Sequence, residues 1–230
     1  MARVLLATAA DPADPVRVAV LAAVIAWVGA VPMFVVTKYA ATVAHEGGHA
    51  LLGRLMLQKV KSVRLERGGG AATSFGGKLP WVVDIPVTMM GHLGPSAFGL
   101  GAAWLAVRGH TAAIFWTSLA FLLLMLFVVR GPVGWLVVPT LVVLAFLAAV
   151  YTEPPTQELL AHVWAWFLLI SAVESSLVVM RGAAYATKGS DHDVLRGLTL
   201  LPPAVWGFLL LVGSLAALAY GGAMLLRVDT

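Results

Sequence analysis

The sequence contains no cysteine, which excludes disulfide bonds and thiolate metal ligands. Charge is also scarce: Asp, Glu, Lys and Arg together make up 11% of the 230 residues, whereas soluble domains carry about 25%. At 60% hydrophobic residues, the chain has too few polar side chains to cover a water-exposed surface. The composition therefore indicates an integral membrane protein, in which any metal ion would be bound by His, Asp or Glu.

The chain contains long apolar runs, which are candidate membrane-spanning helices. Pro32 separates the first two runs, so these form either two helices or one bent element. No internal repeat and no long disordered linker divides the chain. We therefore predict one domain over residues 1–230, an all-α integral membrane bundle of six or seven transmembrane helices. The runs cover residues 17–31, 33–57, 85–107, 111–129, 133–151, 158–181 and 203–226.

The character of the sequence changes between residues 58 and 84, where charged residues and glycines interrupt the apolar pattern. Val60, Val63 and Leu65 are mixed with charges here, and a group of glycines follows. This pattern predicts a small β-hairpin or ribbon at the membrane surface. Such a ribbon could hold an extended substrate segment at its edge. Alternatively, it caps the bundle, and its basic residues contact the anionic lipid leaflet.

One polar pattern lies within the apolar run 33–57: His45-Glu46-Gly47-Gly48-His49, which fits H-E-x-x-H. On a helix, histidines at i and i+4 face the same way, so both imidazoles can bind one zinc ion. The intervening Glu46 is placed to take a proton from a zinc-bound water. Because ionisable side chains at membrane depth are costly and usually have a partner, we predict one zinc ion per chain. The alternative is a polar pair that makes an interhelical contact.

Two histidines and a water leave a tetrahedral zinc ion one ligand short. Without cysteine, the third ligand must be a carboxylate or another histidine. Asp191 and Asp193 lie on the same predicted side of the membrane as the motif, and Glu174 is the only acidic residue well inside a predicted span. His92 is a candidate for a hydrogen-bonding partner of the site rather than a ligand. Periodicity does not choose among the three carboxylates.

The basic residues are unevenly distributed between the two sides of a seven-span topology. Arg108 and Arg227 fall on one side, together with Glu153 and Glu158. The positive-inside rule makes the other, strongly basic side cytoplasmic, and the motif helix ends on that side. We therefore expect a multi-pass protein of the plasma membrane, with its active site toward the cytoplasm. The basic side contains Arg3, Arg17, Lys59, Lys61, Arg64, Arg67, Lys78, Arg130, Arg181, Lys188 and Arg196.

Three segments resemble the site-2 protease group of intramembrane zinc metalloproteases, specifically its compact bacterial members without a PDZ domain. VAHEGGHALLG (43–53) is similar to the helix that carries the zinc motif of that group. GHLGPSAFGLGAA (91–103) resembles its Gly-Pro segment, and GSDHDVLRGLTLLPPAVW (189–206) resembles the late segment that supplies an aspartate. The resemblance implies that Asp191, which follows Gly-Ser at the matching position, is the third zinc ligand.

The same resemblance implies the activity of a zinc metalloendopeptidase. Such an enzyme hydrolyses a peptide bond in or near a transmembrane segment of a membrane protein, here in regulated proteolysis. Its partners are the substrate and the lipid bilayer, and no nucleic acid is expected. Two other hypotheses stay open: a catalytically inactive family member that acts as a membrane scaffold, and a transporter that uses the His/Glu/Asp cluster. The lack of an internal repeat argues against the transporter.

Overall fold

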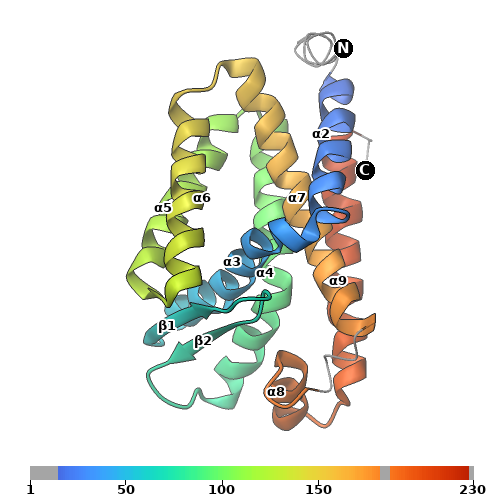
Figure 1. Ribbon diagram of the computed structural model, residues 1–230. Coiled ribbons are helices and arrows are strands. Elements are labelled where there is room, and N and C mark those ends of the chain that lie inside the picture. Colours follow the sequence, from blue (N-terminus) through green and yellow to red (C-terminus); the bar gives the residue numbers. More distant parts are fainter. Residues whose placement is uncertain (1–14, 182–186, 228–230) are drawn as a thin grey trace.

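The computed structural model describes residues 15–181 and 187–227. Most of these residues form helices, and a small sheet lies near one end of the molecule (Figure 1). This confirms the predicted helical bundle with a small β element. The helices are α2 (Pro15–Ala30), α3 (Phe34–Leu55), α4 (Trp81–Val107), α5 (Thr111–Val128), α6 (Pro132–Val150), α7 (Pro154–Arg181), α8 (Asp191–Leu198) and α9 (Pro203–Leu225). The strands are β1 (Val60–Leu65), β2 (Ala71–Phe75) and β3 (Val129–Arg130).

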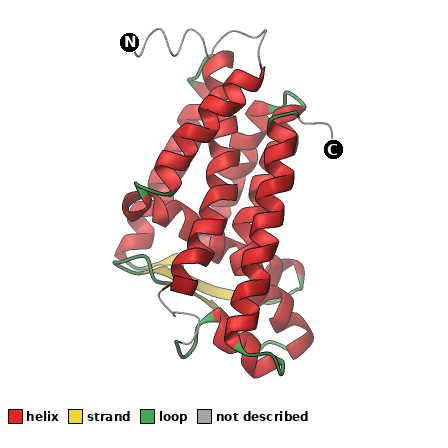
Figure 2. Cartoon of the chain, turned by 90° about the vertical axis from the view of Figure 1, so that its right-hand side faces the viewer, coloured by secondary structure: helices red, strands yellow, loops and turns green. Residues whose placement is uncertain are grey.

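Helices α2, α4, α7 and α9 pack side by side, and the α5–α6 hairpin stands next to them (Figures 1 and 2). Small residues allow the close packing of α2 against α7: Ala22 of α2 and Ala161 and Ala165 of α7 are fully buried in one apolar cluster. Large apolar side chains point outward on the hairpin, where Phe127 is 77% exposed. An apolar exterior of this kind suits a lipid environment.

Four of the described helices, α5, α6, α7 and α9, are each long and apolar enough to cross a membrane. The α2–α3 pair meets the same criterion as one element with a bend of 99°, which gives up to five spans. Helix α4 has 27 residues, but Asp84, His92 and its glycines and prolines dilute its apolar character. The structure therefore supports a membrane-integral helical protein, whereas the predicted number of six or seven spans is not confirmed.

The break between α2 and α3 follows from Pro32, which has no N–H to donate and interrupts the helical hydrogen bonds. Thr37 Oγ1 donates a hydrogen bond of 2.7 Å to the carbonyl of Gly29 and so satisfies an acceptor left at the end of α2. The α2–α3 pair is thus bent at the break that Pro32 predicted.

The bend changes the predicted topology. Helix α2 runs along the main helices, while α3 turns across them toward the sheet, so the start of α2 and the sheet lie at opposite ends (Figures 1 and 2). The seven-span topology, which placed Arg17 on the same side as the basic residues of the hairpin, is wrong on this point. Arg3, assigned to that side too, lies outside the described residues.

The sheet has the strand order β2–β1–β3, with β2 antiparallel and β3 parallel to β1. The predicted hairpin is therefore present. Strand β3 was not predicted, because Val129 was assigned to the end of the span 111–129. Val129 leaves the helix with extended dihedral angles, and Gly131 follows with φ 87°, a conformation that favours glycine. Val129 pairs with Val63, and both are fully buried. Burial of this pair stabilises the short strand where helix periodicity predicted none.

Candidate metal centre

Helix α3 presents His45 and His49 on one face, and α4 lies directly against that face. Two glycines allow this close approach. A Cβ at Gly48 would collide with the carbonyl of Met90, and a Cβ at Gly91 would collide with the imidazoles of both histidines. Gly48 and Gly91 each reduce helix propensity by roughly 1 kcal/mol relative to alanine. In return, they let the backbone of α4 lie next to the histidine pair.

The ring of His49 has a fixed orientation. Its Nδ1 lies 2.8 Å from the carbonyl oxygen of Val87 on α4, so Nδ1 carries the proton and donates it. In the neutral form that binds a metal, Nε2 of this ring is the free acceptor, and it faces Nε2 of His45 at 3.3 Å. A backbone carbonyl that fixes the tautomer of a histidine in this way is typical of metal-binding histidines.

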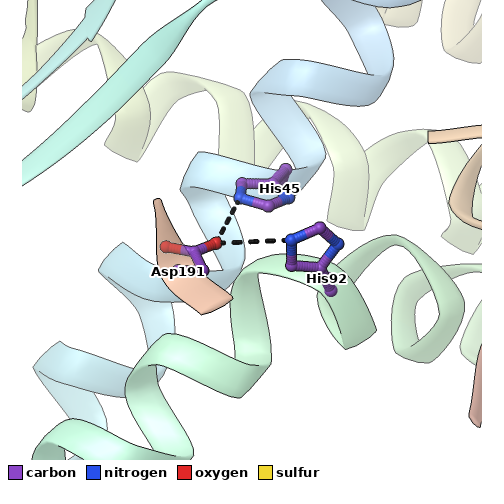
Figure 3. A group of neighbouring side chains, drawn as sticks. All are labelled: His45, His92 and Asp191. Atoms are coloured by element: carbon purple, nitrogen blue, oxygen red, sulfur yellow. Dashed lines mark hydrogen bonds and ion pairs between the residues drawn. The ribbon is translucent and has the colours of Figure 1, made fainter. Parts of the chain in front are cut away.

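Asp191, the first residue of α8, joins the pair from a distant part of the sequence, and Figure 3 shows its carboxylate beside His45. Its Oδ2 lies 3.1 Å from Nε2 of His45 and 3.4 Å from Nε2 of His49. Ser190 caps α8 by accepting a hydrogen bond from the backbone N–H of Asp193, which holds Asp191 in the first turn. Burial raises the pKa of the Asp191 carboxyl, but the charges and hydrogen bonds of His49 and His45 outweigh burial and hold this pKa well below its ordinary value.

The spacing of these three atoms is that of ligands around one tetrahedral ion. At zinc–ligand distances of about 2.0–2.1 Å, two tetrahedral ligands lie about 3.3–3.4 Å apart. The observed separations among His45, His49 and Asp191 are 3.1, 3.3 and 3.4 Å. Two imidazoles and a carboxylate are also a donor set that zinc accepts, with one position left open. The residues therefore fit a zinc ion in both geometry and chemistry.

Glu46 lies beside the histidines in space as well as in sequence. One ligand atom from each of His45, Glu46 and His49 lies within 4.8 Å of the others. Glu46 is 4% exposed, and Thr73 of β2 donates a hydrogen bond of 2.7 Å to its Oε2. The same hydroxyl lies 3.2 Å from the carbonyl oxygen of Glu46. The sheet thus holds one carboxylate oxygen of Glu46 in place.

Comparison with known proteins agrees with this geometry. Over residues 17–221, the chain matches the family model described as Peptidase M50B-like. The chain belongs to this family. Three short segments predicted a resemblance to site-2 protease-like proteins, and membership confirms it. Membership also assigns the chain to a family of metallopeptidases. No curated protein and no solved structure matches it.

Three carboxylates were candidates for the third ligand in this M50B-like chain, and the structure brings Asp191 to the histidines. Asp193 faces away, because its Oδ2 accepts from the backbone N–H of Gly189 at 3.0 Å and its Oδ1 accepts from Arg196 at 2.8 Å. The Gly189 N–H and the Arg196 guanidinium hold the pKa of Asp193 below its ordinary value. Among the described residues, two groups of side chains could hold a metal ion: His45, Glu46 and His49, and His45, His92 and Asp191. Glu174 belongs to neither group.

A third imidazole, that of His92 on α4, lies closer to the M50B-like site than the sequence indicated (Figure 3). Its Nε2 lies 3.6 Å from Oδ2 of Asp191, and its ring packs edge to face against His45 and His192, with centroids 4.8 and 4.6 Å apart. Sequence reasoning gave this residue little weight because a lone buried histidine is usually just hydrogen-bonded. The contacts make His92 a candidate for orienting the Asp191 carboxylate.

The opposite face of α3 borders an apolar cavity of about 530 Å³, which lies between α3, α4, α5 and α7. Helix α3 contributes the small side chains of Ala40, Val43 and Ala44 to its wall, and none of the site residues lines it. The ring of Phe121, also in the wall, packs so closely on Gly47 that a Cβ there would collide with it. This cavity is therefore separate from the metal centre, behind the helix that carries the motif.

Proposed function

We propose that this chain is an intramembrane zinc metalloprotease, which hydrolyses a peptide bond in or near a transmembrane segment of a membrane protein. One observation carries the proposal: Asp191 comes from a distant part of the chain to meet His45 and His49, and the three ligand atoms have separations that suit a tetrahedral zinc ion. The carboxylate of Glu46 lies next to them. Family membership supplies the class of reaction, which is peptide hydrolysis.

The proposed roles follow from the positions of the side chains. His45 and His49 bind zinc through Nε2, and Asp191 binds it through Oδ2. Bound zinc supplies a Lewis acid that polarises a carbonyl and lowers the pKa of water. Glu46 takes a proton from the attacking water at Oε1 and then delivers it to the leaving amine. Thr73 holds Oε2 at 2.7 Å and so keeps Oε1 directed at the reaction.

The sheet supports a route for the substrate. A transmembrane helix has its peptide groups hydrogen-bonded internally, so the segment must unwind before a peptide bond can be attacked. Strand β2 lies at an edge of the sheet and pairs with β1 on one side. An extended segment that pairs with the other side of β2 by β-augmentation would pass close to Glu46, because Thr73 of this strand contacts that carboxylate.

The distribution of basic residues supports a metal site that faces the cytoplasm. Arg17, Arg108 and Arg227 lie at the end of the bundle away from the sheet, whereas most other basic residues lie near the sheet and α8 (Figure 1). The positive-inside rule favours the second end as cytoplasmic. Its basic residues are Lys38, Arg54, Lys59, Lys61, Arg64, Arg67, Lys78, Arg130, Arg181, Lys188 and Arg196.

The zinc content of the purified full-length chain tests the metal site. We expect one zinc ion per chain in the parent and none in His45→Ala. Glu46→Gln should keep the zinc, because Glu46 is placed to transfer a proton and not to bind the ion. Absence of zinc from the parent, even after the metal is supplied, would contradict the proposal and favour a buried polar contact.

Proteolysis is tested separately, by comparing new protein termini in membranes of cells that express the parent or Glu46→Gln. Termini in or near transmembrane segments are expected with the parent and not with the variant. Glu174→Gln is the matched control, since it removes another carboxylate of the bundle that lies in neither metal-binding group, and it should preserve the cleavages. Identical termini with parent and Glu46→Gln, despite bound zinc, would favour an inactive scaffold or a transporter.

A further inference from the structure

A second pocket, of about 330 Å³, lies between the β1–β2 turn and the start of α6, apart from the metal centre. Three arginines line it: Arg64 of β1, Arg67 of the turn and Arg130 of β3. Glu66 also lines it, so its side chains carry three positive charges and one negative charge. A net charge of +2 makes this pocket attractive to an anion.

The sheet places two of these arginines side by side. Arg64 and Arg130 are register partners in the parallel β1–β3 pair, so their side chains leave the same face of the sheet. Like charges on directly opposed residues destabilise a sheet. Among the described residues, no carboxylate forms an ion pair with either guanidinium, although Arg130 donates to the carbonyls of Val129 and Phe127. An anion between the two arginines would turn this repulsion into attraction.

The position of the pocket indicates where its anion comes from. Helix α5 ends at Val128 and α6 begins at Pro132, and both helices are candidate spans. A pocket at their connection lies where two spans leave the apolar layer, at the depth of lipid headgroups. Apolar side chains are exposed just inside this level: Phe127 is 77% exposed and Leu136 is 70% exposed. A free phosphate ion would contact the arginines alone. A lipid would contact the arginines with its headgroup and the exposed apolar side chains with its acyl chains.

We infer that Arg64, Arg67 and Arg130 bind the phosphate group of an anionic membrane phospholipid, whose acyl chains lie along α5 and α6. The planar guanidinium of arginine matches the geometry of phosphate oxygens and binds them in pairs. The bound lipid holds the sheet at the membrane surface. This inference does not depend on proteolysis or on zinc, so it stands or falls separately from the proposed function.

The test titrates the purified full-length chain in detergent with phosphatidylglycerol, phosphatidylcholine or inorganic phosphate, and follows binding by native mass spectrometry. Phosphatidylglycerol is expected to bind most tightly. The variant Arg64→Gln/Arg67→Gln/Arg130→Gln should lose affinity for it on the order of 100-fold. The matched control Lys59→Gln/Lys61→Gln/Lys78→Gln removes three charges of the same region that do not line the pocket, and it should change the affinity far less.

Each other outcome contradicts the inference in a different way. Equal losses in the two triple variants would show a diffuse basic surface in place of a site. Inorganic phosphate that binds as tightly as phosphatidylglycerol would show a free-anion site and exclude the lipid. Equal binding of phosphatidylcholine would exclude any selection for negative charge. Since Arg130 also donates to backbone carbonyls, Arg64→Gln/Arg67→Gln provides a second variant that leaves those bonds in place, and an intermediate loss of affinity is expected.

Discussion

The two faces of α3 differ in how tightly they are packed, although they belong to one helix. On the face toward α4, His45 and His49 meet a glycine backbone that leaves no room for a methyl group at Gly91. On the other face, Phe121 packs closely on Gly47, but the neighbouring apolar side chains of α3 border a cavity of about 530 Å³. The densely packed face is thus the one that carries the proposed zinc ligands, whose positions would have to be held to within about 0.5 Å. The other face needs only to be apolar, and it tolerates empty space.

Gly91→Ala is expected to produce the largest effect that distinguishes the two faces. Its Cβ would collide with the imidazoles of His49 and His45, so we expect the bound zinc to fall from one per chain to none. The control is Gly101→Ala, on the same helix but in the wall of the cavity, where an added Cβ has no atom within 4 Å. It should keep the zinc and raise the unfolding free energy by about 0.5–1 kcal/mol. Metal analysis measures the zinc content of each variant, and thermal unfolding measures its stability. Zinc retained by Gly91→Ala would refute the packing argument.

Asp191→Ala and Asp193→Ala should separate two carboxylates that lie two residues apart on α8. Asp191 lies within 3.4 Å of both histidines, whereas Asp193 is bonded to Gly189 and Arg196. Loss of Asp191 should weaken zinc binding by more than the roughly 10–100-fold typical of an outer-shell partner. Loss of Asp193 should leave the affinity nearly unchanged. Chelator competition measures both affinities, and the reverse order would assign the ligand to Asp193.

Local rules were enough to predict part of this site. The i, i+4 spacing of His45 and His49 places both imidazoles on one face of any helix, and the apolar runs predicted the helices. The choice of Asp191 came from resemblance to a family, since spacing alone left three carboxylates open. The structure places Asp191, and not Asp193, beside the two histidines, because α8 packs against α4 and α9. This is an approach between segments that are distant in sequence.

The remaining features depend on contacts that a single sequence does not display. Pro32 predicted a break, but the 99° bend reflects how α3 packs across the bundle. The hydrogen bond from Thr73 to Glu46 and the approach of His92 to Asp191 each join residues of different elements. Strand β3 forms because Val129 is buried against Val63, within a stretch whose composition favours a helix. In each case a tertiary contact overrides or supplements the local pattern.

His92→Ala should have a moderate effect on the tightly packed face. The imidazole lies 3.6 Å from Oδ2 of Asp191 and packs against His45, so its loss should weaken zinc binding about 10–100-fold while a saturated sample still holds one ion. His162→Ala is the matched control, because His162 is equally buried but bonds to the Glu158 carbonyl of its own helix. Chelator competition that gave equal affinities for the two variants would remove His92 from the site.

Thr73→Val should have the smallest effect on zinc and yet a measurable one on catalysis. The valine keeps the shape of the side chain but removes the 2.7 Å hydrogen bond to Oε2 of Glu46. Because a hydrogen bond to a charged group contributes about 1.5–3 kcal/mol, we expect cleavage to slow by about 10-fold or more at unchanged zinc content. Thr140→Val, whose hydroxyl bonds to a carbonyl of its own helix, should alter neither. If Thr73→Val lost zinc instead, the sheet would act on the ligands themselves, and the dense face of α3 would extend from α4 to β2.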